Sequence, residues 1–307
     1  AVAVGDGAAG WCTMIASTTT SMAAFLPPAV AKEMFAAPGD VAGGVFAPNG
    51  QGVTDGDGFR VTGRWQWGSG TEHCRWILGG AGCDDGTFRL CFFDAAEVTF
   101  HDTWYTSGLR GTGSLDFSVD GVYVPAERTI QPGVSRPTVE STLAAFPNFA
   151  LLAAGIAAVA LGIGRRALDE LLALAGDKRP QFSKRTLAQN PFTQIELAKS
   201  EAGLRAGRAF LRDELTRAWE AASADGRVEL PARVAIRLAC VHATRAAVAA
   251  VDAAYTAAGG TSVYSSHPLQ RCLRDVHTAT QHIMVAPKLD ETLGKLLLGQ
   301  DADTATL

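Results

Sequence analysis

The feature that most constrains the fold is a change of hydrophobic period near residue 140. Residues 39–133 contain short runs in which apolar and polar side chains alternate, and Gly/Asp turn signals separate these runs. That pattern is typical of short antiparallel strands in a small β-barrel or sandwich. From residue 142 onward, apolar side chains recur with a helical period in Ala-rich stretches. Two periods in separate segments predict an α+β fold.

Individual elements follow from the same patterns. The expected strands contain residues 59–62, 75–78, 88–93 and 115–119. Four long helices are expected to pack as a bundle, because only short connections join them. They cover residues 149–176, residues 192–222, a stretch from Pro231 to Gly259-Gly260, and a stretch from Pro268 to about Met284.

The N-terminal segment suggests a third domain. Residues 8–37 are small and apolar, and Pro27-Pro28 splits them into two short helices. Because such a start has little to pack on in its own chain, we expect residues 1–38 to be the remnant of a larger N-terminal helical domain. The expected organisation is therefore a remnant at 1–38, an antiparallel β-barrel at 39–133 and a four-helix bundle at 142–300.

Composition argues for a small-molecule partner. The chain has 27 Lys and Arg against 31 Asp and Glu, and no basic run exceeds two residues, which argues against nucleic acid or a membrane surface. The longest apolar run, residues 149–163, is shorter than the roughly 20 residues of a membrane span, so we interpret it as a buried helix. Six separated cysteines predict reduced thiols in a cytoplasmic protein, with no metal site.

A glycine motif near the start has a familiar spacing. Residues 5–10 satisfy G-x-G-x-x-G, the pattern of a dinucleotide-binding loop. A dinucleotide fold needs a second parallel strand about thirty residues further on, but helices and Pro27-Pro28 follow here. We therefore interpret the motif as a glycine loop that enters a helix, and no nicotinamide site is expected.

Tryptophans mark the first candidate ligand site. In the segment 64–70, Trp65, Trp67 and Ser69 are expected on one face of a strand, because alternate residues point the same way. An indole can form a flat wall for a planar heteroaromatic ligand, and a hydroxyl can bond a ring nitrogen. From these residues alone, an aromatic pair in the barrel core with a turn serine is the favoured alternative.

A glycine-dense loop at residues 108–114 is the second candidate. It carries Arg110, Thr112 and Ser114, and its backbone N–H groups could approach a polar ligand closely. A flexible hairpin connection explains the composition equally well. Both interpretations stay open on the residues alone.

The last long helix supplies the third candidate. Arg271, Asp275, Thr278 and His282 follow one another at steps of 4, 3 and 4, which places them on one face. An acid and an imidazole a turn or two apart could support proton transfer. A structural ion-pair face is the alternative.

Together these motifs resemble the acyl-CoA dehydrogenase superfamily over nearly all of the chain. The order of helical remnant, barrel and bundle is similar, and so are the pairs Gly259-Gly260 and Arg274-Asp275. Trp67-Gly68-Ser69 stands where that superfamily has Trp-Ile-Thr. The resemblance implies that Trp67 stacks on a flavin and that Ser69 contacts flavin N5.

The segment 179–194 resembles the superfamily's R…FG…Q segment in a diverged form, without the Phe-Gly pair. By resemblance, Arg179, Arg185 and Gln194 would reach the cofactor of a neighbouring subunit. The resemblance also implies a homotetramer built through the bundle.

One position departs from the dehydrogenases. Their proton-abstracting glutamate corresponds to Ile283, which cannot act as a base, and the first long helix offers only Glu170. His282 is instead similar to the histidine of the two-component flavin-dependent monooxygenases that share this fold. That branch implies an oxygenase component that receives reduced FMN or FAD from a separate reductase and uses O2 to oxygenate a small organic substrate.

In that branch the implied catalytic residues are Ser69, His282 and Asp275. His282 would protonate or hold the flavin peroxide, Asp275 would orient it, and Arg110, Thr112 and Ser114 would belong to a substrate or flavin loop. An acyl-CoA dehydrogenase with a base elsewhere and a non-catalytic, cofactor-free member of the family are the alternatives. Substrate identity and the choice between FMN and FAD stay open.

Overall fold

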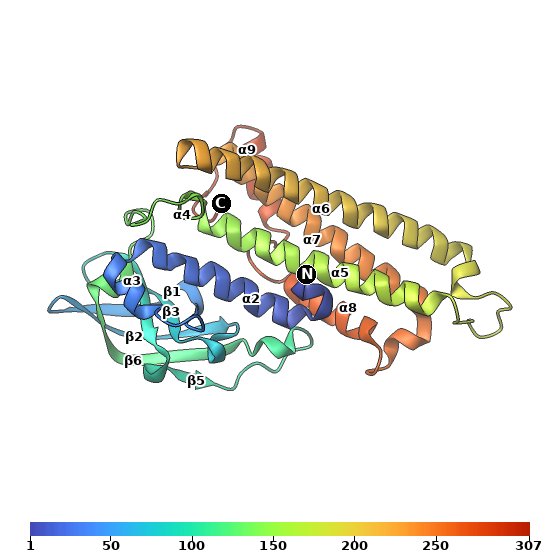
Figure 1. Ribbon diagram of the computed structural model, residues 1–307, viewed down its shortest axis with the longest axis horizontal. Coiled ribbons are helices and arrows are strands. Elements are labelled where there is room, and N and C mark those ends of the chain that lie inside the picture. The colour runs from blue at the N-terminus through green and yellow to red at the C-terminus, as the bar shows by residue number, and fades with distance from the viewer. The chain divides into compact units, whose positions relative to one another are not determined.

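The computed structural model describes all 307 residues, and the chain divides into two compact units. The helical unit contains residues 1–11, 106–109 and 146–307, and the sheet unit contains residues 12–105 and 110–145. The fold class expected from the sequence is confirmed, because both a sheet and a set of long helices are present (Figure 1).

The sheet unit is built on seven strands. Their hydrogen-bonded order is β5-β6-β2-β1-β3-β4-β7. The bounds are β1 Ala42–Asp55, β2 Gly58–Gly68, β3 Trp76–Cys83, β4 Phe88–Asp94, β5 Thr99–His101, β6 Leu115–Pro125 and β7 Thr129–Ile130. All four expected strand runs are confirmed in β2, β3, β4 and β6, although β3 begins one residue later than the run 75–78.

The expectation of a wholly antiparallel barrel is wrong, because the sheet is mixed. β1 and β2 form an antiparallel hairpin, but β3 pairs with the far side of β1 in parallel. The cause is the connection at residues 69–75, which carries the chain from the end of β2 past the start of β1 before β3 begins. The hydrogen-bonded order also ends at β5 and β7 rather than closing on itself.

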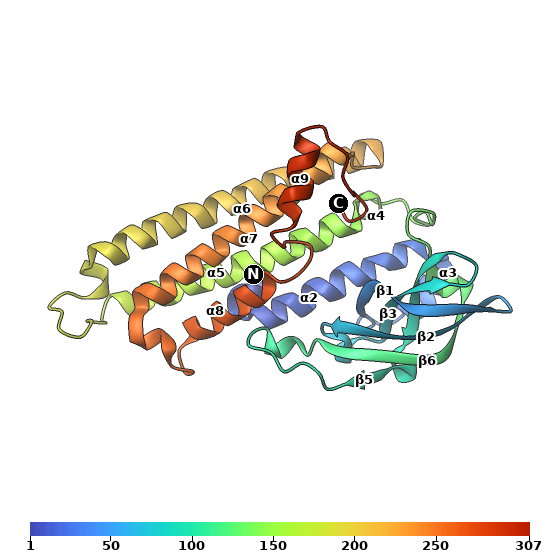
Figure 2. The same cartoon turned by 180° about the vertical axis from the view of Figure 1, so that it is seen from behind.

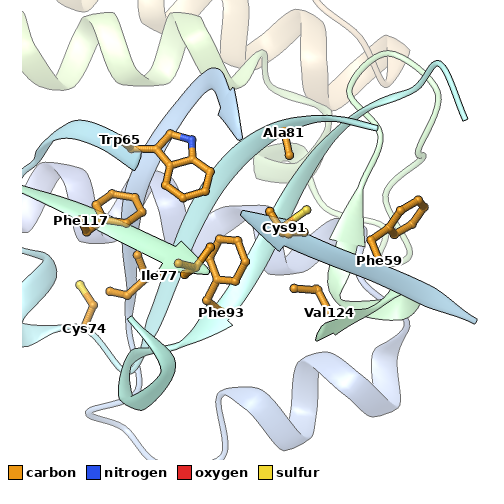
Figure 3. Close-up of a cluster of buried hydrophobic side chains, with 11 residues drawn as sticks. Phe59, Trp65, Cys74, Ile77, Ala81, Cys91, Phe93, Phe117 and Val124 are labelled. Carbon is orange, nitrogen blue, oxygen red and sulfur yellow. The ribbon is translucent and has the colours of Figure 1, made fainter. Parts of the chain in front are cut away.

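Trp65 belongs to the hydrophobic core on one face of the sheet (Figure 3). It is 0% exposed, and its ring is stacked on Phe117 with the centroids 5.1 Å apart. Its indole N–H donates to the carbonyl oxygen of Gly80 at 2.9 Å. A Cβ on any of three neighbouring glycines would lie within 2.8 Å of the indole, so these positions admit no side chain. They are Gly50, Gly63 and Gly79.

The other core of the sheet unit is covered by the N-terminal helices. α2 (Gly7–Thr20) is followed by the 3-10 helix Ser21–Phe25, and α3 (Pro28–Met34) begins after a proline turn. The two short helices expected at residues 8–37 are therefore confirmed. Met22, Leu26 and Met34 pack against Trp76 and Phe92 of the sheet.

Three long helices run side by side in the helical unit (Figures 1 and 2). They are α5 (Asn148–Ala175), α6 (Pro191–Asp225) and α7 (Leu230–Ala258), and α8 (Pro268–Ala279) packs on α5 and α7. The remaining helices are α1 (Val2–Gly5), α4 (Thr142–Ala145) and α9 (Leu289–Leu297). α5 and α7 are long and apolar enough to cross a membrane, but most of each apolar stretch is buried inside the protein, as in core helices.

The fourth helix ends earlier than the sequence predicts. α8 ends at Ala279, whereas the pattern predicts a helix to about Met284. The backbone N–H of Met284 donates to Nδ1 of His282 at 3.2 Å, so a side chain replaces the helical carbonyl acceptor. Thr280 similarly donates its hydroxyl to the carbonyl oxygen of His277 at 2.6 Å. These local hydrogen bonds stabilise a turn after Ala279 and prevent the helix from continuing.

We predict that Trp65→Phe lowers the free energy of unfolding by roughly 2–4 kcal/mol, because it removes a buried hydrogen bond and leaves a cavity. Urea denaturation monitored by circular dichroism measures the loss. Trp67→Phe is the matched control, because Trp67 is exposed, and its effect should stay within about 0.5 kcal/mol. Equal losses in the two variants would contradict the assigned core.

Candidate functional site

The side chain of Trp67, near the end of β2, points into solvent. The pairing of β2 with β6 shifts register between Trp65 and Gly68, so a bulge interrupts the alternation of side chains. Trp67 has a φ of 68°, which is unfavourable for a residue with a Cβ, and its side chain is 68% exposed. The expectation that Trp65 and Trp67 share a face is therefore wrong, since the bulge buries one and exposes the other.

Three buried hydroxyl groups form a row beside that strand end. Ser69 Oγ lies 2.7 Å from Ser114 Oγ, which lies 2.6 Å from Thr112 Oγ1. The backbone N–H of Gly70 also donates to the carbonyl oxygen of Thr112 at 2.8 Å. The structure thus brings together hydroxyls from two separately predicted segments. Arg110 lies on the same short 3-10 helix as Thr112, with its side chain exposed.

Asp275 anchors a loop and does not contact His282. Its Oδ1 accepts the backbone N–H of Leu109 at 2.6 Å, and its Oδ2 accepts from Arg271 Nε at 3.4 Å. Burial raises the pKa of Asp275, although the N–H of Leu109 and the charge of Arg271 oppose that rise. Arg271 also pairs with Asp6, so it bridges two carboxylates.

The loop at residues 106–109 is fixed tightly on α8. Arg274 Nη1 donates to the carbonyl oxygen of Ser107 at 2.6 Å. A Cβ on Gly108 would lie 2.1 Å from the carbonyl oxygen of Arg274, so only glycine allows this approach. Together with the bond from Asp275, these contacts fix residues 106–109 on α8.

His282 lies in the turn after α8, and its imidazole is largely enclosed. The expected polar stripe from Arg271 to His282 is wrong at its last member, because the helix ends at Ala279. The ring packs edge-on against Trp11, with centroids 5.8 Å apart and an interplanar angle of 63°. Burial, and secondly the charge of Arg237, lower the pKa of His282 to about 4. The imidazole is therefore neutral, and since Nδ1 accepts from Met284, Nε2 carries the proton.

Sequence reasoning missed Trp11 and Arg237. Trp11 is a large apolar residue in a helix with no polar motif around it, so nothing in the sequence separates it from core packing. Arg237 gives a usable signal, because it stands alone in the apolar run 234–241 of a helix. A lone cation on such a face is expected to have a specific partner.

Arg179, Arg185 and Gln194 lie on the surface around the connection between α5 and α6. The backbone N–H of Leu187 donates to the carbonyl oxygen of Lys178 at 2.8 Å and closes the base of this loop. Gln194 Nε2 donates to the carbonyl oxygen of Ala188 at 2.8 Å. None of the three contacts Asp275 or His282, the other predicted site residues of the helical unit.

Phe182 stands at the tip of the same loop. Its φ is 64° and its side chain is 100% exposed. A fully exposed phenyl ring on a strained backbone has no packing partner within this chain.

No dehydrogenase base occupies its usual place. Ile283 is 67% exposed and has no ionisable group. Glu170 lies on α5, where it pairs with Arg166 at 2.6 Å. Ile283 has no carboxylate, and the carboxylate of Glu170 is paired with an arginine, so neither residue offers a free base for proton abstraction.

Comparison with known proteins agrees with this geometry. Residues 154–287 match the family described as acyl-CoA dehydrogenase, C-terminal domain. The chain is 31% identical to indole-3-acetate monooxygenase of Pseudomonas putida over 300 residues, 96% of this chain and 77% of that protein. The chain belongs to the flavin-dependent monooxygenases of the acyl-CoA dehydrogenase superfamily. It is therefore an oxidoreductase.

A further monooxygenase and a solved flavin-bound structure are also similar to this chain. The oxygenase subunit HsaA of Rhodococcus jostii is 28% identical over 257 residues, which cover 79% of this chain and 67% of that subunit. XiaF from Streptomyces sp., solved in complex with FADH2 and glycerol, is 27% identical with a TM-score of 0.90. That similarity covers 98% of this chain and 79% of XiaF.

The lowered pKa of His282 predicts a specific pH dependence. Unfolded histidine gains a proton near pH 6.5, but the folded imidazole resists protonation down to about 4. Stability should therefore fall as pH drops through this window, by at most about 3 kcal/mol. Urea denaturation at a series of pH values should show a weaker dependence in His282→Gln, and an unchanged one in the exposed control His277→Gln. Identical pH profiles of wild type and His282→Gln would contradict the neutral imidazole.

Proposed function

We propose that this monooxygenase is the oxygenase component of a two-component system that acts on a small aromatic substrate. Relatives named for aromatic substrates support this class, among them indole-3-acetate monooxygenase and an FADH2-dependent resorcinol hydroxylase. Reduced flavin would arrive from a separate reductase. One observation carries the proposal. Ile283 stands where a dehydrogenase has its carboxylate base, and the neighbouring His282 is neutral.

The sheet unit offers the groups that a flavin requires. The exposed indole of Trp67 supplies a flat wall for the ring system. The buried row of Ser69, Thr112 and Ser114 supplies hydroxyls that can donate to or accept from a ring nitrogen such as N5. An apolar pair with a turn serine would not need a strained backbone that turns an indole toward solvent.

Bound reduced flavin supplies the chemistry of reacting with O2 and passing one oxygen atom to the substrate. The chain's own residues hold and orient protons. His282 is neutral, so its Nε2–H serves as a hydrogen-bond donor and is a weak proton donor. This favours a role in holding an oxygen over a role in releasing a full proton. Asp275 is not bonded to His282, and its role is to hold Leu109.

Acyl-CoA dehydrogenation fits these residues poorly. That reaction needs a carboxylate base, and Ile283 and the paired Glu170 do not provide one. A cofactor-free role is disfavoured by the similarity to enzymes over 96% of the chain. The similarity to XiaF, which is solved with FADH2, supports FAD over FMN as the flavin.

We further propose a homotetramer located in the cytoplasm. Exposed apolar side chains cluster in sequence at the α5–α6 connection and the start of α6, where a second copy of this chain would cover them. They are Phe182, Phe192 and Ile195. Six cysteines without disulfides support a reducing compartment.

We predict that wild-type protein sediments as a tetramer at micromolar concentration, and that Phe182→Ser shifts it toward smaller species, because an exposed aromatic anchor is lost. Val53→Ser, an exposed apolar position on β1, is the control and should leave the sedimentation coefficient unchanged. A monomeric wild-type protein would contradict the assembly.

The experiment that tests the function uses His282→Ala in single-turnover oxidation of reduced flavin with an aromatic substrate present. Hydroxylated product and hydrogen peroxide are measured together. Flavin binding should persist, since Trp67 and Ser69 remain, but the hydroxylation rate should fall by roughly 10²–10⁴-fold. Peroxide release should rise in proportion. His277→Ala, which removes an exposed histidine on α8, is the matched control.

Two outcomes are decisive. Unchanged coupling of flavin oxidation to product in His282→Ala would remove His282 from the mechanism. Loss of flavin binding in the same variant would show that the histidine builds the flavin site instead. Wild-type coupling is expected in His277→Ala.

A further inference from the structure

Arg237 is a buried cation without a carboxylate partner. It lies on α7 and is only 1% exposed. Its guanidinium donates to backbone carbonyl oxygens of three separate segments: Phe149 at 3.4 Å, Met284 at 3.5 Å and Thr306. Nη1 also lies 3.4 Å from the sulfur of Met284, while Nε has no acceptor. Burying a charge on these terms is costly, so a function is needed to explain why arginine stands here.

Met284 connects this guanidinium to His282. The backbone N–H of Met284 donates to Nδ1 of the imidazole at 3.2 Å, and its carbonyl oxygen accepts from Arg237. A planar guanidinium directs its N–H groups along fixed lines, so it can fix the orientation of a peptide group that it binds. The Met284 amide is thereby held toward the imidazole.

We propose that Arg237 is a positioning residue for His282: it fixes the Met284 peptide and thus the Nε2–H tautomer of the imidazole. The proposal rests on the role of His282 in the proposed function. It assigns Arg237 no contact with substrate or flavin. Its effect on the reaction passes entirely through the turn at residues 282–285.

The charge of Arg237 acts in the same direction as its hydrogen bonds. Burial is the main cause of the lowered pKa of His282, and the nearby guanidinium adds to it. Cys240 lies close to Arg237 on α7, and burial raises its pKa to about 12, so it stays uncharged. From α2 the neutral ring of Trp11 faces the imidazole. The positive charge of Arg237 therefore disfavours protonation of the neutral His282 imidazole to the imidazolium.

Nitrogen-15 NMR of the histidine side chains in the full chain tests the proposal. Wild type should show His282 as a neutral Nε2–H imidazole at pH 7. Arg237→Gln should give a mixture of tautomers and raise the pKa of His282 toward its usual value. Arg233→Gln is the matched control, because Arg233 lies one turn earlier on α7 and bonds only the carbonyl of Leu307 at 3.4 Å. The control should keep the wild-type spectrum.

Arg237→Lys covers the case in which Arg237→Gln fails to fold. Lysine keeps the charge, but one ammonium cannot reach the carbonyls of all three segments. The lysine variant should therefore show mixed tautomers, with coupling of flavin oxidation to product lowered by roughly 10-fold to 10²-fold. Circular dichroism confirms the fold of each variant.

The outcomes separate the two proposals. A single wild-type tautomer in a folded Arg237 variant would overturn the positioning role. Mixed tautomers with lowered coupling support it. Mixed tautomers with unchanged coupling would confirm the positioning of His282 and contradict its role in the reaction.

Discussion

The sheet unit depends on a bulge that turns two tryptophans of β2 in opposite directions. Trp65 is sealed between Phe117 and three glycines, with its N–H bonded to a backbone carbonyl. Trp67, two residues later, is turned outward by a left-handed backbone. The free energy gained by burying the first indole offsets the strain at the second, which costs about 1–3 kcal/mol. A rigid strand end therefore carries an exposed indole beside a buried row of hydroxyls.

In the helical unit, the protonation state of one imidazole follows from backbone geometry. α8 stops at Ala279, because His282 and Thr280 take over hydrogen bonds that a helix would use. The turn that results encloses the imidazole against Trp11 and beside Arg237. Enclosure and positive charge both disfavour the imidazolium, so a neutral donor is available at ordinary pH.

Sequence alone predicted much of the fold and located the motifs. The four strand runs and the first three long helices are confirmed because their hydrophobic periods are strong and their boundaries carry proline or glycine. β1 was not predicted, since its glycines and Pro48 hide the alternation. Its parallel pairing with β3 depends on long-range contacts that no local pattern encodes.

Details of the candidate site were harder to predict. The face of Trp67 was wrong because a bulge changes the side-chain period without a clear sequence signal. Asp275 was expected to orient His282, but its partner is the backbone N–H of Leu109, 166 residues away along the chain. Helical spacing places residues on a common face only as far as the helix extends, and α8 ends before His282. Local hydrogen bonds of His282 ended it early.

The most direct test of the central claim is oxygen-isotope labelling. The full chain is supplied with reduced FAD, a small aromatic acid or phenol, and 18O2 in unlabelled water. We expect a hydroxylated product that carries one 18O atom, detected by mass spectrometry. A product whose new oxygen atom comes from water, or no hydroxylated product at all, would contradict it.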